Sequence, residues 1–173
     1  GGGNDGSGYY TLQHSEGYNP DGTWDVGGDA FYWQDYMGDL EYVRQACRLA
    51  RKYGPEDVAL FINDYNLEGT WDQVSKDGIR ASKKLWSLVN WIKKWEADGV
   101  TKIDGIGTQM HISYNENSSA QTGLKNAITG MFKLMASTGK YVRVSELDMG
   151  YNDSNGNPVS TNNMTETQHT NMD

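Results

Sequence analysis

The sequence contains one cysteine, Cys47, among its 173 residues, so it cannot form an internal disulfide. A structural zinc site built from several thiolates is excluded for the same reason. No apolar run approaches the roughly 18 residues that a membrane-spanning helix needs, which argues against a helical membrane protein. The formal net charge of −8 argues against a nucleic-acid-binding protein, because such proteins present a basic face.

Basic residues are absent from both ends of the chain. Residues 1–38 contain six acidic residues and residues 146–173 contain five, and neither segment has a Lys or an Arg. Residues 1–38 also hold ten of the 21 glycines, a composition that is typical of loops. The chain starts with Gly-Gly-Gly and without Met, and from this start we expect it to be part of a longer protein.

Aromatic residues make up 12% of the sequence, and several of them fall within this glycine-rich segment. This content argues against a disordered chain. Long loops that carry aromatic side chains are often functional, so residues 1–38 are predicted to pack against the rest of the protein. Trp86, Trp91 and Trp95 lie in a predicted helix and are expected to pack in the core, as is Cys47.

From residue 39 onward, helices and strands are predicted to alternate. Leu40, Val43 and Cys47 form an apolar stripe at helical spacing, and Gly54-Pro55 ends that helix. Further stripes predict helices and short apolar runs predict strands. The expected order is helix 39–53, strand 58–62, helix 76–97, strand 103–112, helix 120–136 and strand 141–148, with another helix starting near residue 165.

This order predicts the α/β fold class, because strands that alternate with helices of this length are typical of parallel β-α units. A parallel sheet must be covered on both faces. Two architectures meet that requirement: an open doubly wound sheet and part of an eight-stranded barrel. A complete barrel takes about 250 residues, which is more than this chain has.

Each predicted strand ends in polar side chains. The first ends in Asn63-Asp-Tyr-Asn66, the second carries Gln109 and His111, and the third carries Glu146 and Asp148. Gln109 and His111 are two residues apart and therefore face the same side of their strand, and the same holds for the two carboxylates. Catalytic groups gather at the carboxyl ends of barrel strands, so we expect these side chains to form a site.

Signatures of several other chemistries are missing. Gly105-Ile-Gly107 lies inside a strand, which does not fit a dinucleotide-binding turn. His14, His111 and His169 are too widely spaced to indicate a metal site, and no Gly-x-Ser-x-Gly elbow is present. We therefore expect neither a metal nor a cofactor. Carboxylates, amides and aromatic rings remain, and these are the side chains that sugar hydrolysis and sugar binding use.

Three segments of the sequence resemble consecutive strand motifs of glycoside hydrolase family 10. They are Leu60-Phe-Ile-Asn-Asp-Tyr-Asn-Leu-Glu68, Ile103-Asp-Gly-Ile-Gly-Thr-Gln-Met-His111 and Val144-Ser-Glu-Leu-Asp148. They occur in the family's order, and the resemblance covers about residues 31–150. The family consists mainly of endo-β-1,4-xylanases with a TIM (β/α)8 barrel.

The resemblance implies a partial TIM (β/α)8 barrel with about strands five to seven and their intervening helices. Residues 1–38 would form the long loop that follows strand four, and residues 39–150 would supply the β-α units. Residues 151–173 would form a loop and the start of the next helix. All three parts would belong to one catalytic domain.

The resemblance also implies roles for the charged residues. Glu146 matches the family's catalytic nucleophile, His111 the histidine that hydrogen-bonds the nucleophile, and Asp148 the carboxylate that orients this histidine. The implied mechanism retains the anomeric configuration. Retaining enzymes hold two carboxyl groups about 5–5.5 Å apart, one of which attacks while the other serves first as acid and then as base.

Four further residues match positions that bind substrate in the family. Gln109 matches an amide that lies near the nucleophile and the sugar. Tyr65 matches a stacking tyrosine on the leaving-group side, Asn66 matches a neighbouring amide, and Asn63 supports them.

The family's acid/base glutamate ends strand four, in a motif similar to Trp-Asp-Val-Val-Asn-Glu. Trp24-Asp-Val-Gly-Gly-Asp29 resembles an altered copy in which Asp29 takes the place of the glutamate. Its side chain is one methylene shorter, and its position leaves no room for the loop that precedes the segment Phe31-Tyr-Trp-Gln-Asp-Tyr36. We therefore expect the motif to precede Gly1, so that the acid/base lies outside this chain.

The resemblance thus implies a retaining endo-β-1,4-xylanase that acts on xylan or xylo-oligosaccharides and is secreted, periplasmic or attached to the cell surface. The chain by itself is expected to be inactive and to need the complementary N-terminal half of the barrel as its partner. We expect no nucleic-acid partner and no membrane. Three alternatives stay open: a non-catalytic glycan-binding barrel or module, a cellulase-type family member, and an unrelated open-sheet α/β protein.

Overall fold

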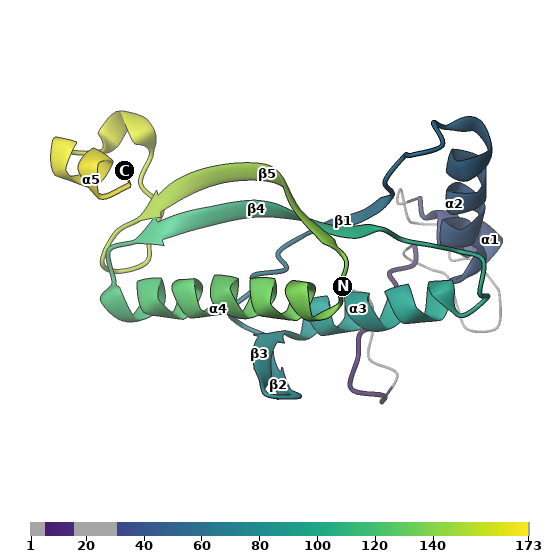
Figure 1. The fold of residues 1–173 in the computed structure, drawn as a ribbon. Coiled ribbons are helices and arrows are strands. Elements are labelled where there is room, and N and C mark those ends of the chain that lie inside the picture. The colour runs from purple at the N-terminus through teal and green to yellow at the C-terminus, as the bar shows by residue number, and fades with distance from the viewer. Residues whose placement is uncertain (1–5, 16–30, 173) are drawn as a thin grey trace. The chain divides into compact units, whose positions relative to one another are not determined.

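The computed structural model describes residues 6–15 and 31–172, which form two compact units (Figure 1). Of the described residues, the first unit comprises 6–15, 31–60 and 86–104, and the second comprises 61–85 and 105–172. The elements, in chain order, are α1 (Trp33–Met37), α2 (Glu41–Tyr53), β1 (Phe61–Tyr65), β2 (Gln73–Lys76), β3 (Ile79–Ser82), α3 (Lys83–Glu96), β4 (Gly105–Asn115), α4 (Ser118–Ser137), β5 (Tyr141–Asn152), η1 (Thr161–Asn163) and α5 (Glu166–Met172).

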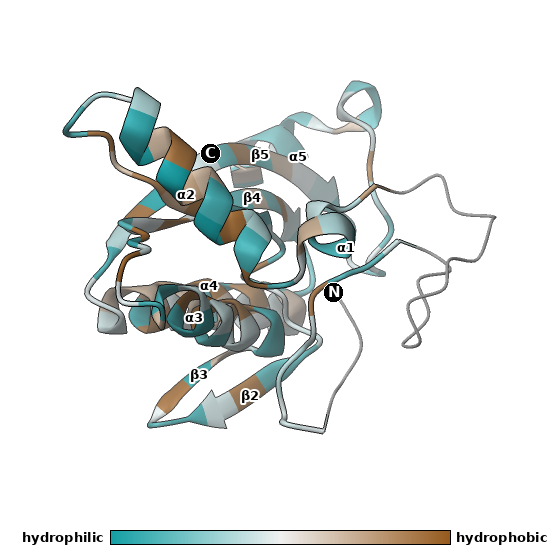
Figure 2. Ribbon diagram, turned by 90° about the vertical axis from the view of Figure 1, so that its right-hand side faces the viewer, coloured by the Kyte–Doolittle hydropathy of each residue, from teal (hydrophilic) through white to brown (hydrophobic). Residues whose placement is uncertain are grey.

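The first unit is built around tryptophan side chains. Figure 2 shows apolar and polar residues alternating along α2, which is the pattern of a helix with one buried face. The indole nitrogen of Trp95 donates a hydrogen bond of 2.8 Å to the carbonyl of Asp39. The polar N–H group of this buried ring therefore has a hydrogen-bond partner. As the sequence predicted, the buried apolar residues of the unit include Val43, Cys47, Trp86, Trp91 and Trp95.

The second unit contains a three-stranded parallel sheet in the order β1-β4-β5. β4, α4 and β5 form a β-α-β unit in which α4 runs along one face of the two strands (Figure 1). Side chains from β4 and α4 are buried on that side, among them Ile106, Met110, Met131, Leu134 and Met135. The α/β class with a parallel sheet, which the alternating pattern predicted, is confirmed.

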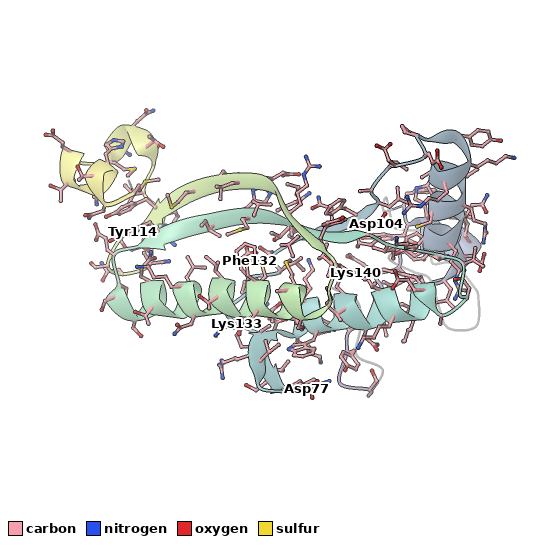
Figure 3. The ribbon with its side chains drawn as sticks, viewed as in Figure 1. Asp77, Asp104, Tyr114, Phe132, Lys133 and Lys140 are labelled. Carbon is pink, nitrogen blue, oxygen red and sulfur yellow. The ribbon has the colours of Figure 1, made fainter. Side chains whose placement is uncertain are left out.

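A β-hairpin occupies residues 73–82, where the sequence predicted the start of a helix at residue 76. β2 and β3 pair in antiparallel fashion, and Asp77 and Gly78 between them have φ angles of 51° and 76°. Two successive residues with positive φ form the tight turn that Asp-Gly favours, and Figure 3 labels Asp77 at the tip of this hairpin. The prediction of a helix over 76–97 was therefore wrong at its start, and α3 begins only at Lys83.

The predicted strands are shifted or extended. β1 is Phe61–Tyr65, where the apolar run had predicted 58–62. The difference arises because Asn63 and Tyr65 pair with β4 even though they belong to the polar end of the motif. β4 and β5 continue to Asn115 and Asn152, past the ends that were predicted for them.

The predicted bounds of two helices agree more closely with the structure. α2 begins at Glu41 and ends before Gly54, and α4 begins at Ser118 because the side chain of Asn117 accepts hydrogen bonds from two backbone amides of its first turn. The helix expected near residue 165 is α5, whereas α1 and η1 were not predicted. Most of the predicted loop 1–38, including Asp29, lies outside the described residues. Within residues 6–15 and 31–172, no helix combines the length and apolarity needed to cross a membrane.

Candidate active site

Five of the residues that the strand motifs singled out lie on one face of the β1-β4-β5 sheet. The register pairs Tyr65 with Gln109 and Gln109 with Glu146, so these three residues form one row across the sheet. His111 pairs with Asp148 further along the same two strands. Residues paired across neighbouring strands point to the same face, and neighbouring strands lie about 4.8 Å apart. The sheet therefore collects these side chains within reach of a single small ligand.

A β-bulge in β5 decides which way Glu146 points. The register steps from Thr108–Val144 to Gln109–Glu146, which leaves Ser145 as the extra residue. In an unbroken strand Glu146 would share a face with Val144, because side chains alternate. The extra residue reverses this alternation, so Glu146 joins the face that carries Gln109.

Asn63 holds this bulge from β1, the strand on the other side of β4. Its Oδ1 accepts a hydrogen bond of 2.6 Å from the hydroxyl of Ser145, across the central strand β4. The residue of β4 that pairs with Asn63 is Gly107, where a Cβ would lie 2.5 Å from the same Oδ1 atom. Gly107 thus leaves the space through which the amide reaches Ser145, next to Glu146. The resemblance implies that Asn63 supports the substrate-binding residues, and in the structure its side chain reaches the bulge.

His111 links the two carboxylates of β5. Its Nδ1 lies 2.7 Å from Asp148 Oδ2, and its Nε2 lies 3.2 Å from Glu146 Oε2. The hydrogen bond with Asp148 raises the pKa of His111, and the negative charges of both carboxylates act in the same direction against the opposing effect of desolvation. A protonated imidazole donates from both ring nitrogens, so His111 can serve both partners at once.

These three side chains are open to solvent. The exposed fractions are 41% for His111, 49% for Glu146 and 69% for Asp148. A ligand can therefore reach Glu146 while His111 holds one of its oxygens. Elsewhere in the described part of the chain, as here, no three His, Cys, Asp or Glu side chains are grouped so as to hold a metal ion.

Asn66 is the one predicted site residue that lies beyond the strands. Its φ of 56° turns the chain after β1, and its carbonyl accepts a hydrogen bond from the amide of Gly69 at 3.2 Å. Asn66 lines a cavity of about 370 Å³, and His111 lines it as well. Trp71 forms part of the wall and is 71% exposed. Amides, hydroxyls and an exposed indole are groups that bind the hydroxyls and apolar faces of sugars.

Two neighbours of the site, Glu68 and Ser145, belong to the strand motifs, but the motifs do not predict their surroundings. Glu68 lines the same cavity but is only 4% exposed, and burial raises its pKa against the effect of the positive charges on Lys84 and His111. Among the described residues, its Oε2 has no hydrogen-bond partner. Ser145 belongs to the motif Val144-Ser-Glu-Leu-Asp148, but its position in a bulge depends on how β5 pairs with β4, a strand that is distant in the sequence. Neither burial nor register can be read from the motif itself.

Comparison with known proteins adds an independent finding. Residues 19–173 match the sequence model of glycosyl hydrolase family 10. Endo-1,4-beta-xylanase A of Thermoanaerobacterium saccharolyticum is 34% identical over 120 residues, which cover 69% of this chain and 9% of that protein. Endo-1,4-beta-xylanase A of Phanerodontia chrysosporium is 34% identical over 135 residues, which cover 78% of this chain and 27% of that protein.

A solved structure gives the same result. A family 10 structure from Paenibacillus barcinonensis superposes with a TM-score of 0.50 at 29% identity. The match covers 80% of this chain and 38% of that chain. This chain therefore spans well under half the length of the relatives that it matches.

Proposed function

The chain belongs to glycosyl hydrolase family 10, as its three strand motifs predicted, and from this membership we propose that it forms part of a retaining endo-β-1,4-xylanase. Its parallel β-α units are part of a TIM barrel. Two relatives that are 34% identical to it, over 120 and 135 residues, are named as endo-1,4-β-xylanases, which supports xylan as the substrate.

The proposed nucleophile is Glu146. The observation that carries this assignment is the bridge from Asp148 through His111 to Glu146, on the face that also holds Gln109 and Tyr65. His111 holds Oε2 of Glu146, which leaves Oε1 to attack the anomeric carbon. A covalent bond then forms between the sugar and Glu146 as the leaving-group oxygen departs. Water breaks this bond in the second step and restores the original anomeric configuration.

The mechanism needs a second carboxyl group that protonates the leaving oxygen. We assign this group to a glutamate outside the present chain, because the motif around Asp29 is altered and its side chain is short. On this proposal the chain alone does not hydrolyse xylan. The exposure of four apolar residues on one face of β5 supports a complementary barrel segment that would cover them: Val142, Val144, Leu147 and Met149.

The test compares hydrolysis of xylo-oligosaccharides by the complete protein that carries these residues and by the present chain alone. Glu146→Gln should lower kcat in the complete protein by a factor of about 10³ or more, because the amide cannot attack. Glu166→Gln, an exposed residue of α5, is the matched control and should leave kcat unchanged. Undiminished hydrolysis by the Glu146→Gln variant would overturn the assignment of the nucleophile.

Two further arms test the remaining parts of the proposal. Turnover by the chain alone that disappears in Glu146→Gln would show that the acid/base lies within these residues. Cello-oligosaccharides assayed in parallel test the preference for xylan, and faster cleavage of these would indicate a cellulase-type member. Binding of xylo-oligosaccharides without any hydrolysis by the complete protein would indicate a glycan-binding barrel.

A further inference from the structure

The ammonium group of Lys84 lies at the carboxyl end of β1 and contacts Tyr65 twice. Its Nζ is 3.8 Å from the centroid of the Tyr65 ring, and it donates a hydrogen bond of 2.6 Å to the carbonyl of the same residue. It also forms an ion pair of 3.0 Å with Oδ1 of Asp64. The side chain of Lys84 is only 17% exposed, so these contacts form largely out of water.

The backbone around Lys84 is fixed by the loop that follows β1. The amide of Lys84 donates to Oδ2 of Asp72 at 3.0 Å. The hydroxyl of Ser82 accepts from the amide of Leu85 at 3.1 Å and donates to the carbonyl of Leu67 at 2.8 Å. The first turn of α3 is therefore tied to residues 67–72, and the lysine stem starts from a defined point. The backbone of Lys84 is held in this way, and its ammonium is held by the contacts with Tyr65 and Asp64.

The ring of Tyr65 is held on one face and left open elsewhere. A cation above an aromatic ring is attracted by the negative face of that ring, and the attraction is stronger where water is excluded. Tyr65 remains 49% exposed, so a ligand can still approach the ring from the other side. Tyr65 also lies in the row that contains Gln109 and Glu146. The orientation of the ring therefore decides how a sugar on Tyr65 is placed relative to Glu146.

We propose that Lys84 is a positioning residue, which holds the Tyr65 ring as a platform for a xylose unit on the leaving-group side of Glu146. This inference rests on the proposed function, because it takes Tyr65 to be a sugar-stacking residue. Lys84 does not touch the sugar. It fixes the Tyr65 ring before the substrate arrives, so that the Tyr65 side chain loses less conformational freedom when the sugar binds.

A purely structural role for Lys84 makes a different prediction. Its charge also offsets the carboxylates of Asp64 and the buried Glu68, and losing that charge would weaken the fold whether or not Tyr65 is present. A positioning role acts through the ring, so it disappears when the ring is removed. A double-mutant cycle on substrate affinity separates the two roles.

The experiment measures kcat and KM for xylo-oligosaccharides in the complete protein. Lys84→Met should raise KM roughly three- to tenfold and change kcat by less than about twofold, because a platform binds the ground state and the transition state alike. Lys84→Arg should restore most of the affinity, since a guanidinium also stacks on aromatic rings. The matched control is Lys133→Met, an exposed lysine of α4 that Figure 3 labels, and it should match the wild type.

The decisive comparison is Lys84→Met in a Tyr65→Ala background. The inference requires that KM does not rise further there. An equal rise in both backgrounds, a fall in kcat without a rise in KM, or a Lys84→Arg variant as impaired as Lys84→Met would each overturn it. Unfolding curves in urea check that every variant is folded. If Lys84→Met fails to fold, Lys84 is required for the stability of the fold, and the inference is overturned.

A separate measurement distinguishes failure of this inference from failure of the proposed function. The ε-methylene protons of a lysine above an aromatic ring are shifted upfield by the ring current. In an NMR spectrum of the complete protein, the ε-methylene protons of Lys84 should show this shift and lose it in Tyr65→Leu, whereas those of Lys94, which lies 4.2 Å from the centroid of the Trp91 ring, should keep theirs. Absence of the shift would overturn the contact itself. A normal shift in a protein whose complete form neither binds nor hydrolyses xylo-oligosaccharides would overturn the proposed function and, with it, the role of Lys84.

Discussion

Gly123 and Gly130 lie on the same helix, α4, and offer a direct test of how the β2–β3 hairpin packs. A Cβ at Gly123 would meet nothing within 4 Å, and this residue is exposed. A Cβ at Gly130 would come well under 3.0 Å from the carbonyl oxygen of Arg80 and 3.1 Å from its carbonyl carbon. Arg80 belongs to β3, so the obstacle is backbone and cannot rotate away. Helix and hairpin would have to move apart to accept the methyl group.

The expected free energies follow from this difference. Replacing glycine by alanine inside a helix stabilises it by about 0.5–1 kcal/mol, and this gain is shared by both sites. Forcing extra volume into a packed interior costs about 1–3 kcal/mol. Gly123→Ala should therefore raise the free energy of unfolding, and Gly130→Ala should lower it by up to about 2 kcal/mol. The difference between the free energies of unfolding of the two variants therefore measures the packing cost alone.

Urea unfolding followed by far-ultraviolet circular dichroism gives both free energies under identical conditions. The m values should stay the same, because neither substitution changes the surface exposed on unfolding. A Gly130→Ala variant at least as stable as Gly123→Ala would refute the close packing of β3 on α4.

Two further predictions concern the charged site and the bulge. In Asp148→Asn, the pKa of His111 should fall below the wild-type value, because the variant loses the hydrogen bond and part of the charge that raise it. Since that pKa is raised in the folded state, the pairing stabilises the fold fully below the ordinary histidine pKa and is lost as the pH rises through the folded value. An NMR titration of the imidazole checks this, and an unchanged pKa would contradict the bridge. Ser145→Ala should lower the free energy of unfolding by about 1 kcal/mol through loss of the hydrogen bond to Asn63, and should lower xylan hydrolysis by the complete protein as Glu146 loses its support. Full activity in Ser145→Ala would show that the bulge holds without it.

The helices could be predicted well because their signals are local. The apolar stripe that contains Val43 and Cys47 marks α2, and Gly54 ends it. The hairpin carried a local signal too, since Asp77-Gly78 is a turn sequence, but the stripe of α3 was extended too far towards the N-terminus. The error came from following the helical period past the point where the turn residues begin.

The strands and the site show the limit of local patterns. The apolar run identified β1 but not its end, because Asn63 and Tyr65 are polar residues on the open face of the sheet. Spacing predicted correctly that Gln109 and His111 share a face, whereas the face of Glu146 depends on Ser145 being inserted opposite β4. Such a register follows from pairing between distant strands. Lys84 likewise acquires its partners only when the loop after β1 folds back onto α3.

The most direct test of the central claim is a trapping experiment on the complete protein with a 2-fluoro xylobioside that carries a good leaving group. Such a substrate lets the covalent sugar intermediate form but slows its hydrolysis, so the adduct can be located by mass spectrometry of peptides. One 2-fluoroxylobiosyl adduct is expected, on the peptide that contains Glu146 and on that carboxylate. An adduct on another residue, or turnover of xylan with no adduct at Glu146, would contradict it.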